Sequence, residues 1–124
     1  MADKLAFLIW AATPDHPELV VTPLIHALAA RALDAEVEIH FAGPAVRWLV
    51  DGVADAAYAT ADKEKSVGDF LRQLEAEDVR LLACGMARAA WVASPEALIA
   101  AAGAAGATAF VARSLDPAWR VLVF

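Results

Sequence analysis

The chain opens with Leu5-Ala6-Phe7-Leu8-Ile9-Trp10-Ala11, an apolar run in which polar residues do not alternate with apolar ones. A strand of a parallel sheet has this pattern, because helices cover both of its faces. The next segment, 13–17, contains two prolines between polar residues, which is typical of a turn. We therefore predict that the first strand is central and buried in an α/β fold.

Strand and helix patterns alternate along the rest of the chain. Ser66 and Asp69 resemble a capping box, with Asp in place of the usual Glu. Thr22 with Pro23 and Ser94 with Pro95 are further predicted helix starts. The predicted helices are 23–32, 45–53, 66–77 and 95–105, with 55–65 as an exposed loop. The predicted strands are 5–11, 36–42, 79–84, 109–112 and 120–124.

This order predicts a three-layer α/β/α fold around a mostly parallel five-stranded sheet. Polar residues alternate with apolar ones along 36–42, so this strand is expected to flank the central one. The last connection, 113–119, is short for a crossover helix. The fifth strand either runs antiparallel at an edge or crosses over by a minimal turn. With 124 residues, we expect a single domain over 1–124.

Composition limits the class of partner. The net charge of −6 and the absence of a Lys/Arg cluster argue against nucleic acid and against an anionic membrane surface. Hydrophobic residues make up 60% of the chain, above the usual ~45–50%. We therefore expect a homo-oligomer that covers part of this apolar surface. One cysteine fits a reducing compartment, and a cytoplasmic location is expected.

Cofactor and metal motifs are missing from the sequence. No glycine lies in the turn after the first strand, so a dinucleotide fingerprint or a P-loop cannot form there. His16, His26 and His40 are too scattered for a metal site. His40 is the exception among the histidines. It ends the second predicted strand, at the sheet edge where α/β proteins bind ligands, and is a candidate for a functional role. We expect no cofactor and no metal.

Cys84 is the main candidate for chemistry. It ends a buried strand and precedes Gly85-Met86-Ala87-Arg88, a predicted helical turn whose free N–H groups would favour a thiolate. Arg88 would add positive charge. The alternative is a buried structural thiol, since free cysteine is among the most buried residue types. These residues alone do not decide between the two.

Four stretches together resemble the DsrE/DsrF-like family, whose members include the TusD-type sulfur-relay proteins. They are the polar loop 12–16, Phe41-Ala42-Gly43-Pro44-Ala45-Val46, Ala83-Cys84-Gly85-Met86 and the final strand 121–124. The resemblance implies that Cys84 carries sulfane sulfur as a persulfide, in a trimer or hexamer of the chain. The sequence departs from the family pattern in two places. Ala87 replaces the small polar residue that often follows the cysteine by three positions, and the helix before the final strand is shortened to 114–119.

The leading hypothesis is a sulfurtransferase-type sulfur carrier that takes sulfur from a donor protein and gives it to an acceptor protein. The alternative is a non-catalytic oligomeric binding module in which Cys84 is structural. If Cys84 is reactive, the other strand ends should form its pocket. The predicted supporting residues are Trp10, Thr13, His40, Gly43, Gly85, Met86, Arg88 and Arg113.

Overall fold

The computed structural model describes residues 3–124 and contains a five-stranded, entirely parallel sheet. The strand order is β4-β3-β2-β1-β5. The strands are β1 (Lys4–Ile9), β2 (Glu36–Phe41), β3 (Arg80–Ala83), β4 (Ala102–Ala104) and β5 (Trp119–Val123). The predicted α/β class with a largely parallel five-stranded sheet is therefore confirmed.

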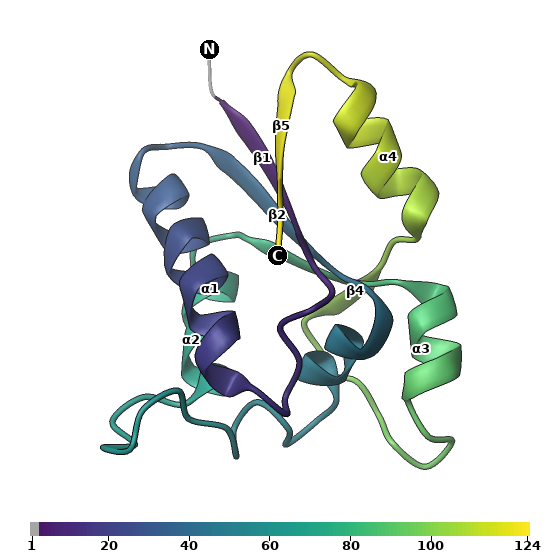
Figure 1. Ribbon diagram of the computed structural model, residues 1–124. Coiled ribbons are helices and arrows are strands. Elements are labelled where there is room, and N and C mark those ends of the chain that lie inside the picture. The colour runs from purple at the N-terminus through teal and green to yellow at the C-terminus, as the bar shows by residue number, and fades with distance from the viewer. Residues whose placement is uncertain (1–2) are drawn as a thin grey trace.

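Helices lie on both sides of this sheet (Figure 1). They are α1 (Pro17–Ala32), the 3-10 helix η1 (Gly43–Leu49), α2 (Val67–Ala76), α3 (Gly85–Trp91) and α4 (Ala107–Leu115). Helices α1 and α2 pack together on one face, and α4 contacts β1 and β5 on the other. Within residues 3–124, no helix has the length and apolar character needed to cross a membrane.

The central strand is β2, so the prediction that β1 is central and β2 flanks it is wrong. It pairs with β1 on one side and with β3 on the other. Strand β1 lies between β2 and β5, and Ala6, Phe7 and Ile9 are buried as predicted. The polar residues that suggested an exposed face, Glu38 and His40, are only 2% and 3% exposed. Arg80 and Arg113, from distant parts of the chain, donate hydrogen bonds to Glu38, and Glu38 in turn pairs with His40.

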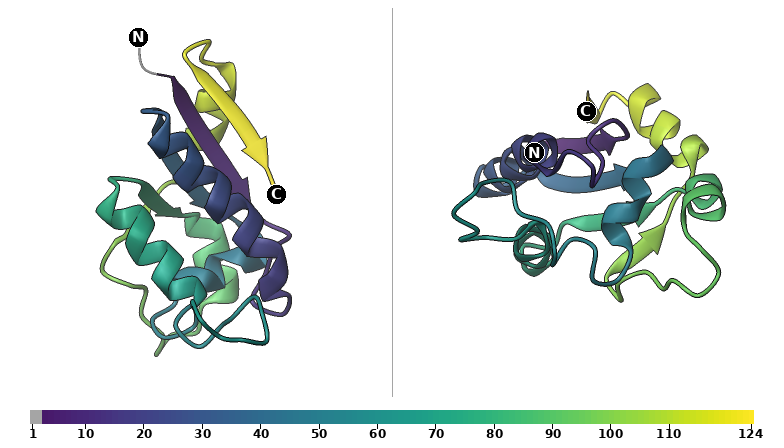
Figure 2. Two further views of the ribbon diagram at one scale, coloured as in Figure 1. Left: turned by 90° about the vertical axis from the view of Figure 1, so that its left-hand side faces the viewer. Right: turned by 60° about the horizontal axis from the view of Figure 1, so that its bottom comes forward.

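The end of the chain differs most from the sequence prediction. Residues 109–112, predicted as a strand, lie within α4, and this helix is the crossover that makes β5 parallel to β1. Figure 2 shows β5 beside β1 at the edge of the sheet. Phe124 donates its backbone N–H to the carbonyl of Leu8 at 2.7 Å, which continues this ladder to the last residue.

The predicted helix 95–105 does not form. Its first part makes backbone hydrogen bonds with the end of η1 instead: Ile99 donates to Leu49, and Asp51 donates to Ala97, both at 2.8 Å. Its last part is the edge strand β4. Alanine favours helix, but the stretch has no polar face that a surface helix could expose, and it uses its backbone groups in these tertiary bonds.

Helix boundaries were predicted with mixed success. The capping box is confirmed, with the Ser66 hydroxyl accepting from the Asp69 N–H and the Asp69 carboxylate accepting from the Ser66 N–H, both at 3.0 Å. Helix α1 begins at Pro17, so Pro23 lies inside it. The predicted helix 45–53 is replaced by the 3-10 helix η1, which starts at Gly43 and ends at Leu49, so that residues 50–53 are not helical.

Candidate functional site

A small apolar pocket lies between the sheet and the start of α4, at the carboxyl ends of the strands. Its volume is about 220 Å³. The lining comes from Leu8 of β1, His40 and Ala42, Cys84, the segment 105–107, and Phe110 with Val111 of α4. Parallel sheets commonly bind ligands at this edge. The pocket is smaller than the clefts of about 300–1,000 Å³ that hold drug-sized ligands.

Cys84 is half-buried in this lining, and its thiol is free. Its backbone N–H donates to the carbonyl of Phe41 at 3.0 Å, which extends the pairing of β3 with β2 by one residue. Ala105 donates to the carbonyl of Ala83 at 3.1 Å. These two bonds hold the cysteine at the sheet edge and bring the segment before α4 beside it.

His40 is the second polar residue of the pocket, and it is almost fully buried. Its Nε2 lies 2.9 Å from Oε1 of Glu38. Its ring makes an edge contact with Phe110, with ring centroids 5.2 Å apart. Its Nδ1 is buried without a hydrogen-bond partner among residues 3–124. An unsatisfied polar atom of this kind needs an explanation, because burial without a partner costs free energy.

Glu38 is the centre of an ion cluster beneath the pocket. Arg113 of α4 approaches its carboxylate with Nε at 2.8 Å from Oε1, and Arg80 of β3 lies 3.3 Å from Oε2. Burial acts to raise the pKa of the Glu38 carboxyl, but the hydrogen bonds from Arg113 and His40 outweigh it and hold this pKa below its ordinary value. Glu38 is therefore ionised at neutral pH, and it holds His40 in place.

The amino end of α4 also borders the pocket. Gly106 is its N-cap and provides no side chain to the N–H groups of the first turn, and both Gly106 and Ala107 line the pocket. Such N–H groups and the positive end of the helix dipole stabilise a nearby anion. The pocket therefore has the N–H groups of a helix start in one wall and the thiol of Cys84 in its lining.

The structure brings together only part of the predicted site. Cys84 and His40 share the pocket, whereas Met86 is 84% exposed and Trp10 is 54% exposed. Arg88 is exposed and lies with Gly85 at a separate shallow depression. Arg113 acts on the site through Glu38. The predicted residues outside the pocket are Trp10, Thr13, Gly43, Gly85, Met86 and Arg88.

Glu38, Phe110 and the start of α4 were not expected at the site. Because residues 109–112 were predicted as a strand, neither Phe110 nor a helix start at Gly106 was expected to border the pocket. A signal for Glu38 was present, because Glu38 and His40 are two residues apart and so lie on one face of a strand. A buried carboxylate and histidine at this spacing indicate a hydrogen-bonded pair.

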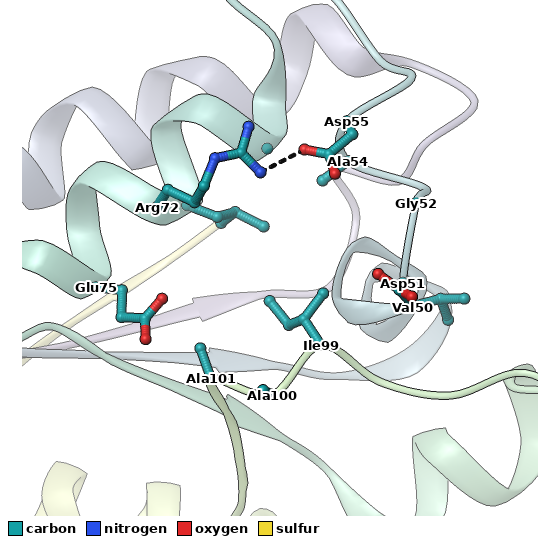
Figure 3. Close-up of a pocket in the computed structure, with 12 residues that line it drawn as sticks. Val50, Asp51, Gly52, Ala54, Asp55, Arg72, Glu75, Ile99, Ala100 and Ala101 are labelled. Atoms are coloured by element: carbon teal, nitrogen blue, oxygen red, sulfur yellow. Dashed lines mark hydrogen bonds and ion pairs between the residues drawn. The ribbon is translucent and has the colours of Figure 1, made fainter.

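A second pocket, of about 210 Å³, lies at the side of α2 (Figure 3). It is lined by Asp51, Asp55 and Glu75 together with Arg72. Arg72 already forms ion pairs with Asp55 at 2.6 Å and with Asp69 at 2.7 Å. None of the predicted site residues lines this pocket, and within residues 3–124 no cluster of side chains is arranged to bind a metal.

Comparisons with known proteins agree on the fold. A sequence model of the DsrE/DsrF-like family matches residues 4–124. No curated protein sequence matches the chain significantly. Among solved structures, the crystal structure of the YchN protein from E. coli is similar over 100% of both chains, with a TM-score of 0.77 and 17% sequence identity. At this identity, the similarity establishes a shared fold.

Proposed function

The chain belongs to the DsrE/DsrF-like family, and from this premise we propose that it is a sulfur-relay protein of the TusD type. In this proposal Cys84 accepts a sulfane sulfur as a persulfide and passes it to a thiol of a partner protein. The single observation that supports it best is the position of Cys84 in an apolar pocket that is also lined by His40, whose Nδ1 is buried without a partner.

The proposed reaction needs one thiolate and no redox partner. Cys84 Sγ attacks the outer sulfur of a donor persulfide, R–S–SH. A new S–S bond forms to Cys84 while the donor's S–S bond breaks, and the donor leaves as a thiolate. The reverse attack by an acceptor thiolate returns Cys84 to its thiolate form. The described part of the chain has one cysteine, so an internal disulfide cannot compete with this exchange.

The pocket's size and lining support a small, weakly hydrated cargo. A single sulfur atom fits a space of about 220 Å³ whose walls are almost entirely apolar. Exclusion of water protects a persulfide from side reactions. A phosphorylated or otherwise highly charged ligand would find no lysine or arginine among the lining residues. The competing possibility is a binding module in which Cys84 only fills space.

Delivery of sulfur to cyanide distinguishes the carrier from the binding module. The protein is treated with inorganic polysulfide, freed of excess reagent and mixed with cyanide, which removes an outer persulfide sulfur as thiocyanate. We expect one thiocyanate per chain, because Cys84 is the one thiol. A protein that releases no thiocyanate above the buffer blank would support the binding module.

We also propose that the chain forms a homo-oligomer, as a trimer or a hexamer. Support comes from apolar side chains on α4 and β5: Val111 is 51%, Leu115 80% and Val123 55% exposed. Trp48 is fully buried in the core and is not part of this apolar surface. Light scattering at micromolar concentration should give a multiple of the 13.1 kDa chain mass. A stable monomer would contradict the proposal.

A further inference from the structure

The unpaired nitrogen of His40 has a specific chemical state. The side chain of His40 is 4% exposed and that of Glu38 is 3% exposed. Glu38 is ionised and its oxygens only accept hydrogen bonds, so Nε2 of His40 carries the hydrogen that it donates to Oε1. Nδ1 is then the ring nitrogen that is free to accept a hydrogen bond. It is also the one buried side-chain nitrogen or oxygen without a partner among residues 3–124.

The sheet register places His40 near Cys84. His40 pairs with Leu82 across the parallel strands, and Phe41 pairs with Ala83. Cys84 is therefore one strand across and two residues further along, on the order of 8 Å between Cα atoms. Both side chains line the same pocket, yet no hydrogen bond joins Nδ1 to the thiol. A persulfide would extend the cysteine by an S–S bond of about 2 Å.

We propose that Nδ1 of His40 is the hydrogen-bond partner of the outer sulfur of the Cys84 persulfide. This inference rests on the proposed function. The outer sulfur gives its proton to Nδ1, which leaves a persulfide anion beside an imidazolium, and Glu38 stabilises that imidazolium. The nitrogen is unpaired in the thiol form because its partner arrives with the cargo.

The same proton serves the delivery step. The imidazolium returns its proton to the outer sulfur, and an acceptor thiolate then attacks this sulfur, so that a new S–S bond forms between acceptor and cargo. The bond from the outer sulfur to Cys84 Sγ breaks, and its electron pair stays on Sγ. Cys84 is thereby released as the thiolate, as in the proposed function, and His40 is again neutral. The charge of the attacking thiolate passes to Sγ of Cys84, the acceptor persulfide keeps the proton, and no oxidant or reductant is needed.

The first test follows the nitrogen itself in the wild-type protein. Nitrogen NMR of protein labelled at histidine should show the Nδ1 resonance of His40 shift when inorganic polysulfide loads Cys84. It should return to its starting position after cyanide removes the sulfur. The resonances of His26, which is exposed and bonds to the carbonyl of Thr22 at 2.7 Å, serve as the control and should stay unchanged. If the Nδ1 resonance of His40 does not shift when Cys84 is loaded with sulfur, the inference is wrong.

The second test is the exchange His40→Phe, which keeps an aromatic ring beside Phe110 and removes both nitrogens. We expect the rate of sulfur delivery to cyanide to fall at least about tenfold, since hydrogen bonds to charged groups have effects of this order. His26→Phe is the matched control and should deliver at the wild-type rate. An unchanged rate in a folded His40→Phe protein would refute the role of His40.

These outcomes separate the inference from the proposed function. Suppose that the wild type takes up sulfur, but its His40 resonance does not shift and His40→Phe delivers sulfur at the wild-type rate. The proposed sulfur carrier is then supported and the role of His40 is refuted. If the wild type takes up no sulfur, both fall together.

Discussion

Replacing Glu38 with glutamine is expected to lower the free energy of unfolding at neutral pH by about 3–5 kcal/mol. The carboxylate lies at the centre of the ion cluster and accepts hydrogen bonds from His40, Arg80 and Arg113. Glutamine has nearly the same shape but no charge, so Arg113 would lose its ionic partner in a half-buried position. Urea denaturation of both proteins measures the difference.

The pH dependence of this difference provides a second check. The pKa of Glu38 lies below its ordinary value of 4.5 in the folded protein. Its ionised form therefore contributes stability that is fully present above pH 4.5 and is lost as the pH falls through the lowered folded pKa. The gap between wild type and Glu38→Gln should shrink in acid. A gap that is the same in acid as at neutral pH would contradict this account.

Glu36→Gln is the matched control for Glu38→Gln. Glu36 lies on the same strand, but its side chain is 58% exposed and forms a surface ion pair with Lys4 at 3.5 Å. Exposed ion pairs contribute about 0–1 kcal/mol. If the two variants lost similar amounts of stability, burial of Glu38 would not be the cause.

Replacing Cys84 with serine is expected to reduce thiocyanate release after polysulfide treatment to the level of the buffer blank. A hydroxyl oxygen does not form the S–S bond in which the cargo is held. Serine is similar in size to cysteine, and the position is half-buried. The free energy of unfolding should therefore change by about 1 kcal/mol or less.

Met86→Leu is the control for this experiment. Met86 also contains sulfur and is two residues from Cys84 in the sequence. It is 84% exposed and does not line the pocket. This variant should release as much thiocyanate as the wild type. Strong destabilisation by Cys84→Ser, together with a wild type that carries no sulfur, would make Cys84 a structural residue.

The sequence predicted the parts of the fold that depend on local patterns. The apolar run 5–11 predicted the buried strand β1, and Ser66 with Asp69 predicted the start of α2. The place of Cys84 at the end of β3 followed from the apolar segment before it. In each case neighbouring residues are enough, because burial on both faces or a capping box has its own sequence signature.

The place of β2 and the shape of the site could not be predicted in this way. A strand with Glu38 and His40 on one face is equally consistent with exposure to water and with burial against a charged partner. Here the partner is Arg113, which is 75 positions away in the chain. The same long-range contact fixes α4 above the pocket, although residues 109–112 have the apolar character of a strand.

The most direct test of the sulfur carrier is the intact mass of the wild-type chain after treatment with inorganic polysulfide. The account predicts a gain of one sulfur atom per chain, which disappears when a small thiol is added as acceptor. A mass that does not change on treatment, or an added sulfur that no thiol removes, would contradict the claim that Cys84 carries and delivers sulfane sulfur.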